Sequence, residues 1–128
     1  MSTQEDFREP TLLLLSALAP GPRHGYALME AVADLSGGRV RLKPGSLYAT
    51  LDRLEREGLV GESGTEVVAG RHRRYYELTD AGTEALSGQV DRLERLAATA
   101  SEALRRRSGV RARAPFGLLV GEPKGGLR

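Results

Sequence analysis

The cationic run Gly70–Arg74 contains the residues that point most directly to a binding chemistry. In an extended segment, Arg71 and Arg73 project from one face, and His72 and Arg74 project from the other. Because the run holds no acidic residue, folding crowds like charges together, and we expect an anion to bind there. Arginine pairs well with phosphate. The run therefore predicts contact with a nucleic-acid backbone or minor groove, and the alternative is solvated surface charge.

The total number of arginines is weaker evidence for a nucleic-acid partner than their clustering in Gly70–Arg74. The 128 residues include 17 arginines and 2 lysines but no isoleucine and no asparagine. A GC-rich genome explains that bias without a nucleic-acid partner. The net charge is +2, and residues 105–128 alone carry +6, so the basic balance comes from the C-terminal segment.

The residues that build most catalytic and metal sites are missing or scattered. The chain has no cysteine, and no cluster of carboxylates accompanies His24 or His72 to complete a metal site. It has no glycine-rich phosphate loop and no recognisable pair of catalytic carboxylates. The segment Gly61–Thr65 lacks the last glycine of a serine nucleophile elbow. We therefore expect no enzyme activity, no cofactor and no metal ion.

A helix expected from Pro44 to about Gly58 is the second candidate for nucleic-acid contact. Proline suits its first turn, and glycine suits the left-handed position just past its last turn. Leucines at helical spacing give it a buried stripe. The residues that face away from this stripe are Ser46, Ala49, Thr50 and Arg53.

The outward residues of this helix suit the major groove, which admits one helix. There Ala49 and Thr50 would touch a thymine methyl group, and Arg53 would reach guanine or phosphate. The alternative is a solvated face with an Asp52–Arg56 ion pair.

Three further residues near this helix have two interpretations each. Lys43, just before the helix, either contacts DNA or is solvated. Tyr48 is either a phosphate-binding hydroxyl or a core aromatic with an exposed tip. Tyr26, like His24 two positions before it, is first a hinge and packing residue, and the alternative for Tyr26 is a phosphate contact.

The last expected helix carries an apolar seam at heptad spacing. The seam consists of Leu86, Val90, Leu93, Ala97, Ala100 and Leu104, with Leu96 beside it. From residue 80 to residue 107 the helix would extend about 42 Å, which is more than a domain of this size covers. We therefore expect a homodimer through this helix. The alternative is a helix bent at Ser87–Gly88 that folds back on its own domain.

The order of elements predicts a mainly α fold with a small β-hairpin (α+β), a winged helix-turn-helix followed by a long C-terminal dimerisation helix. The expected elements are helices over 10–18, 23–35, 44–57 and 80–107 and strands over 59–68 and 71–78, with a turn near Ala69–Gly70 and Thr79 as the N-cap of the last helix. The expected divisions are an N-terminal arm over 1–9, a DNA-binding domain over 10–79, a dimerisation helix over 80–107 and a flexible basic tail over 108–128. No apolar run reaches the roughly 20 residues of a membrane span, so we expect a cytoplasmic protein with no membrane contact.

Three stretches of this chain resemble the PadR family of bacterial transcriptional regulators. They are LLSALAPGPRHGY over 14–26, LKPGSLYATLDRLEREGLV over 42–60 and GRHRRYYELTDAG over 70–82. The resemblance implies a dimer that binds a palindromic operator and is often released by a small-molecule effector at the dimer interface. The single C-terminal helix is similar to that of the shorter subfamily. The sequence departs from the family at Ala49, where proline is frequent, and it has no tryptophan with which to stack flat aromatic drugs.

The sequence thus predicts a dimeric transcriptional regulator that binds double-stranded DNA, with repression as the expected sign. The alternative is a winged-helix module for protein–protein contact, in which the arginines of the hairpin meet an acidic partner.

Overall fold

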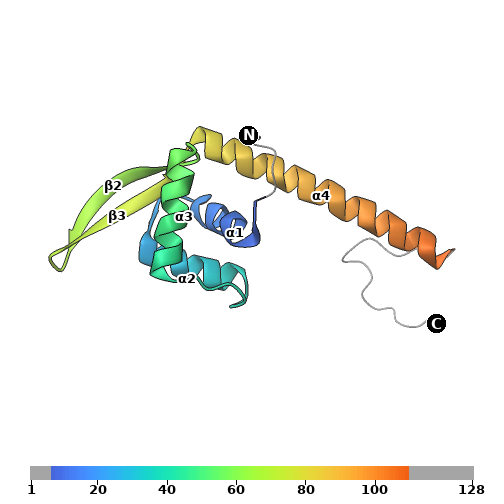
Figure 1. Cartoon of the computed structure of the whole chain (residues 1–128), viewed down its shortest axis with the longest axis horizontal. Helices are drawn as coiled ribbons and strands as arrows, with labels where there is room; N and C mark the ends of the chain where they lie inside the picture. The colour runs from blue at the N-terminus through green and yellow to red at the C-terminus, as the bar shows by residue number, and fades with distance from the viewer. Residues whose placement is uncertain (1–6, 110–128) are drawn as a thin grey trace. The chain divides into compact units, whose positions relative to one another are not determined.

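The computed structural model describes residues 7–109 of the chain. Three short helices precede a β-hairpin and a long helix (Figure 1), which confirms the predicted winged helix-turn-helix. The elements are α1 (Glu9–Leu18), β1 (Arg23–His24), α2 (Gly25–Leu35), α3 (Pro44–Arg56), β2 (Val60–Val68), β3 (Arg71–Leu78) and α4 (Asp80–Ser108). Residues 1–6 and 110–128 lie outside the described residues, and with them most of the predicted arm and nearly all of the predicted tail.

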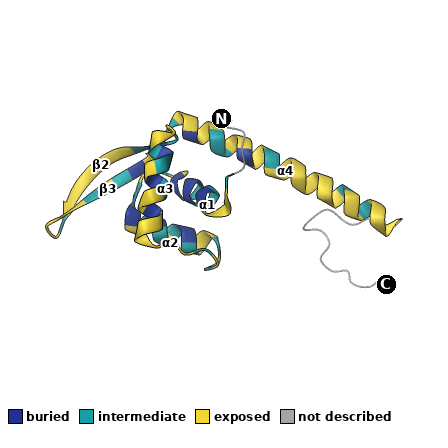
Figure 2. Cartoon of the chain, in the orientation of Figure 1, coloured by how far each residue is buried: buried dark blue, intermediate teal, exposed yellow. Residues whose placement is uncertain are grey.

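The core is built from the leucine stripes of the three short helices, where the dark blue of Figure 2 gathers. Burial of each large apolar side chain stabilises the fold by about 1.5–3 kcal/mol. The fully buried side chains are Leu14, Leu15, Leu18, Leu28, Val32, Leu47, Leu51 and Leu54. The stripe predicted for α3 therefore fixes which face of that helix remains outside.

The start of α2 differs from the prediction, because Arg23 and His24 form a short strand. They pair with Tyr76 and Tyr75 of β3, which makes a three-stranded antiparallel sheet in the order β1-β3-β2. The helix begins only at Gly25, where His24 Nδ1 accepts a hydrogen bond from the backbone N–H of Ala27 at 3.2 Å. Pairing with a strand more than 50 residues further along the chain overrides the helical pattern at these two positions.

The hairpin of β2 and β3, called the wing below, has the turn that the sequence predicts. Ala69 and Gly70 have φ values of 53° and 78°. Positive φ at both central residues is the pattern of type I′ turns, whose twist suits two-residue hairpins. The register places Glu66 opposite Arg73 and Val68 opposite Arg71, with an irregularity between Glu62 and Gly64.

The end of α3 is fixed by the predicted glycine. Gly58 has a φ of 80°, its N–H donates to Glu55 O, and the N–H of Leu59 donates to Leu54 O, both at 3.0 Å. These two bonds make a Schellman motif. Leu59 packs on the core, so the helix ends at a defined point before β2.

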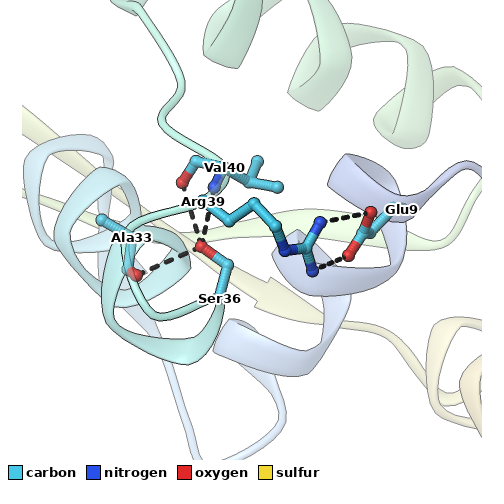
Figure 3. A network of polar contacts seen from close by, with 5 residues as sticks. All are labelled: Glu9, Ala33, Ser36, Arg39 and Val40. Carbon is cyan, nitrogen blue, oxygen red and sulfur yellow. Dashed lines mark hydrogen bonds and ion pairs between the residues drawn. The ribbon is translucent and has the colours of Figure 1, made fainter.

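The loop between α2 and α3 is held by polar contacts that Figure 3 shows. Ser36 Oγ accepts from the N–H of Val40 at 2.9 Å and also contacts the carbonyl oxygens of Ala33 and Val40. Arg39 forms a two-pronged ion pair with Glu9 of α1. These contacts therefore fix the path of the loop that leads to Pro44, the first residue of α3.

Helix α4 runs one residue beyond the predicted end and continues through Ser87–Gly88. The chain divides into two compact units at Asp91 and Arg92, and each is described by itself. In the first unit, Thr79 Oγ1 caps α4 by accepting from the N–H of Gly82 at 2.9 Å, as predicted. Among residues 7–109, no helix is long and apolar enough to cross a membrane.

Candidate nucleic-acid interface

The outward face of α3 consists of small side chains. Ser46 and Ala49 are exposed and Thr50 is half-buried, as the leucine stripe predicts. Lys43, which directly precedes the helix, is also exposed. Small polar and methyl-bearing side chains allow a helix to approach base edges closely, so this face suits a DNA groove.

Arg53 is partly exposed, with 43% of its side chain accessible, and it also forms contacts within the domain. Its Nη2 donates to Thr11 Oγ1 of α1 at 3.2 Å, and its Nη1 lies 3.5 Å from Glu57 Oε2. The side chain is long enough to reach Thr11 of α1 from the next turn of α3 after Thr50. Arg53 therefore joins α3 to α1 here, whereas the Asp52–Arg56 ion pair weighed as an alternative is present.

The wing arginines differ in their partners. Arg74 pairs with Glu62 of β2, with 2.9 Å between Nη1 and Oε2, and Arg73 faces Glu66 across the strands. The inference that the arginines crowd together without a nearby acid is therefore wrong, because β2 supplies two carboxylates. Arg71 is exposed, lies opposite Val68, and forms none of the ion pairs found among residues 7–109. Arg71 is thus the wing arginine most available to an external anion.

An open concavity lies where α2 begins, beside the first turns of α3 and the wing. Its lining includes His24, Tyr26, Tyr48, Arg71, His72 and Arg73. Tyr48 is 45% exposed and Tyr26 is 63% exposed, so the interpretation of Tyr48 as a core aromatic is wrong. Among residues 7–109, the aromatic side chain buried in the core is Tyr76 of β3. With Arg74, which also lines the concavity, six of the predicted contact residues and His24 thus share one surface with aromatic and cationic character.

His24, expected to be a hinge and packing residue, connects this surface to the wing through contacts that the sequence did not reveal. Its ring meets the Tyr75 ring edge-on, with 5.4 Å between centroids, and the Tyr75 hydroxyl donates to Glu66 at 2.6 Å. Partial burial, and then the charge of Arg73, lower the pKa of His24. The neutral ring suits its structural role, because Nδ1 must stay unprotonated to accept from Ala27.

We expect the stability of the protein to depend on the protonation of His24. Since the pKa is lowered in the folded chain, the unfolded chain binds a proton first as the pH falls. This contribution is fully present above about pH 6.5 and decreases below it. Urea unfolding at pH 7.5 and pH 5.5 should therefore show a larger loss of stability in wild type than in His24→Asn, which keeps a capping side chain that does not titrate. Equal losses in the two proteins would contradict this role.

The apolar residues of α4 fall into two groups. Leu86 is half-buried and packs on the core of the first unit, so this member of the predicted seam already has an intramolecular partner. Val90, Leu93, Leu96 and Leu104 are between 41% and 54% exposed. Ala97 and Ala100 are exposed as well. In the second unit, Leu93, Ala97, Ala100 and Leu104 therefore form an exposed apolar stripe on α4, a costly surface to leave in water.

Comparison with known proteins places this geometry in a family. The profile described as "Transcriptional regulator PadR-like family" matches residues 14–88. A curated relative, "Transcriptional regulator Rv3488" of Mycobacterium tuberculosis, is 43% identical over 70 residues, which are 55% of this chain and 62% of the relative. The chain covers less than two thirds of each curated relative that it matches.

Solved structures share the fold. A PadR family transcriptional regulator of Eggerthella lenta has a TM-score of 0.61 at 26% identity, over 75% of this chain and 84% of that one. Bacillus subtilis PadR, solved in complex with operator DNA, has a TM-score of 0.58 at 24% identity, over 65% of this chain and 47% of that one. That likeness supports the architecture of the winged helix.

Proposed function

The chain belongs to the PadR-like family of transcriptional regulators, and from this premise we propose that it is a dimeric repressor that binds a palindromic DNA operator. The observation that carries the proposal is the exposed Arg71, which forms no ion pair within residues 7–109 and lines a concavity together with Tyr48 of α3. An available cation next to a helix with small outward side chains is the arrangement that phosphate and groove contacts need.

The wing and α3 contribute differently to DNA binding. The wing supplies affinity through phosphate contacts by Arg71, His72, Arg73 and Arg74, and these contacts carry no sequence information. Helix α3 supplies specificity through Ser46, Ala49 and Thr50. Lys43, Tyr48 and Tyr26 add contacts around the helix start. Arg53 contributes by holding α3 on α1.

The proposal includes a homodimer through the exposed stripe of α4. Two copies would remove Leu93 and Leu104 from water, and Ala97 and Ala100 would allow the helices to approach closely. A dimer also matches an operator with twofold symmetry. Release by a small molecule at the dimer interface, and action in the cytoplasm, are the parts of the proposal that rest on the family resemblance.

Arg71→Ala tests the proposal through the salt dependence of DNA binding. We expect weaker binding to all sequences alike. The slope of log affinity against log salt should become shallower by about 1 for each phosphate that the variant no longer neutralises. Fluorescence anisotropy with labelled duplexes at several salt concentrations measures both quantities.

Arg106→Ala is the matched control, since it makes the same change in net charge on α4. If Arg71→Ala and Arg106→Ala give the same affinity and slope, the wing does not touch DNA. An acidic protein partner whose binding requires Arg71 would then favour the alternative function.

A further inference from the structure

Gly25, the first residue of α2, lies where the ring of Tyr48 needs space. A Cβ at this position would overlap the Tyr48 hydroxyl oxygen, and it would come within 2.9 Å of Cζ and 3.3 Å of Cε1 of the same ring. The three atoms nearest to that Cβ thus all belong to one side chain. Gly25 is buried although Tyr48 is 45% exposed, so the ring covers the glycine and keeps its own outer side open.

The backbone does not explain a glycine at this position. Gly25 is absent from the residues with positive φ, so its conformation is open to any residue. It is also part of a helix, where glycine is less favourable than most residues. The absence of a side chain therefore serves the close approach of Tyr48.

The contact of the Tyr48 ring with Gly25, called the seat below, joins three elements that together form the candidate interface. Tyr48 belongs to the first turns of α3. Gly25 follows His24, which caps α2 and pairs with Tyr75 in β3. The ring therefore connects α3 directly to the start of α2 and, through His24, to the base of the wing. Gly25, Tyr48 and the wing residues Arg71 and Arg73 all line the same concavity.

We propose that Gly25 is a positioning residue for DNA binding, because its lack of a side chain sets how closely the Tyr48 ring of α3 packs on the start of α2 beside the wing. The proposal rests on the function proposed above. A methyl group at position 25 moves the ring outward, toward the face that DNA occupies, and α3 and the wing then no longer present one matched surface. The obstructing atom is the far end of a side chain, so the domain folds with the ring displaced.

A double-mutant cycle of Gly25→Ala and Tyr48→Ala tests this seat. Gly25→Ala should lower the affinity for a DNA fragment selected by the wild-type protein by about tenfold, the loss expected for one charge-assisted hydrogen bond. In the Tyr48→Ala background the same substitution should change affinity by less than about twofold, because the ring is gone. Gly88→Ala is the control: it is a helical glycine of α4 with no atom within 4 Å of its Cβ, and it should bind as wild type does.

A second measurement detects the position of the Tyr48 ring on Gly25 in the absence of DNA. In protein labelled with carbon-13 at tyrosine rings, Gly25→Ala should shift the signals of Tyr48 strongly and those of Tyr26 weakly, with an unchanged far-ultraviolet circular dichroism spectrum. Equal losses of affinity from Gly25→Ala in both backgrounds, or an unmoved Tyr48 signal, would overturn the proposal. Wild-type protein that binds no fragment would overturn the function itself, and this inference with it.

Discussion

Leu93→Glu is expected to yield monomers whose affinity for a palindromic operator is at least about a hundredfold below that of wild type, the scale of avidity that disappears when two linked modules separate. Leu93 is 41% exposed on α4, so the substitution removes little packing within the chain. In a symmetric pair of helices it places a carboxylate from each copy close to the twofold axis, where like charges repel. It also removes from each copy an apolar side chain whose burial stabilises by about 1.5–3 kcal/mol.

Sedimentation velocity at micromolar concentration measures the oligomeric state, and anisotropy with the operator measures affinity. Thr99→Glu is the control, because it adds the same charge to an exposed position of α4 outside the seam. It should remain dimeric and bind normally. A wild-type protein that sediments as a monomer and still binds the palindrome tightly would contradict dimerisation. A Leu93→Glu variant that remains a dimer would contradict dimerisation through the α4 stripe.

Gly82→Ala is expected to lower the free energy of unfolding by about 1–3 kcal/mol or more, the cost of overpacking a closed site. A Cβ here would overlap Leu59 O and lie 3.0 Å from Leu59 C. Because these are backbone atoms, no rotamer change relieves the contact. The same oxygen accepts from the N–H of Thr79 at 3.1 Å, and Thr79 Oγ1 donates to Gly58 O at 2.6 Å. The substitution therefore separates the end of α3 from the start of α4.

Thermal and urea unfolding at fixed protein concentration measure this effect. Helix propensity alone predicts the opposite sign, since alanine exceeds glycine by about 0.8–1.0 kcal/mol inside a helix. Gly88→Ala should show that increase in stability, because nothing lies near its Cβ. Gly82→Ala at or above wild-type stability would show that the junction between α3 and α4 is not closely packed.

The sequence predicted elements whose signals are local. Pro44 and Gly58 mark the two ends of α3, and the structure has the helix between them with the predicted Schellman motif. The turn at Ala69–Gly70 and the cap at Thr79 are also confirmed. Each of these signals depends on residues within six positions of one another, so the pattern is visible along the chain.

The parts that sequence reasoning missed depend on contacts between distant segments. The strand at Arg23 forms by pairing with Tyr76, and Arg53 turns toward Thr11 of another helix. The carboxylates beside the wing arginines come from β2, which no pattern along β3 reveals. Gly25 carries no signal of its own in the sequence, because its role emerges only when Tyr48 is seated on it.

Selection of genomic DNA fragments by the purified wild-type protein tests most directly whether α3 and the wing read DNA. After several rounds at moderate salt, the bound pool should be enriched in a palindrome whose half-site centres lie about 10–10.5 base pairs, or a multiple of that distance, apart. The double variant Arg71→Ala/Arg73→Ala should recover little DNA from the same library. A wild-type pool with no enriched sequence, and recovery equal to that of the double variant, would contradict the account.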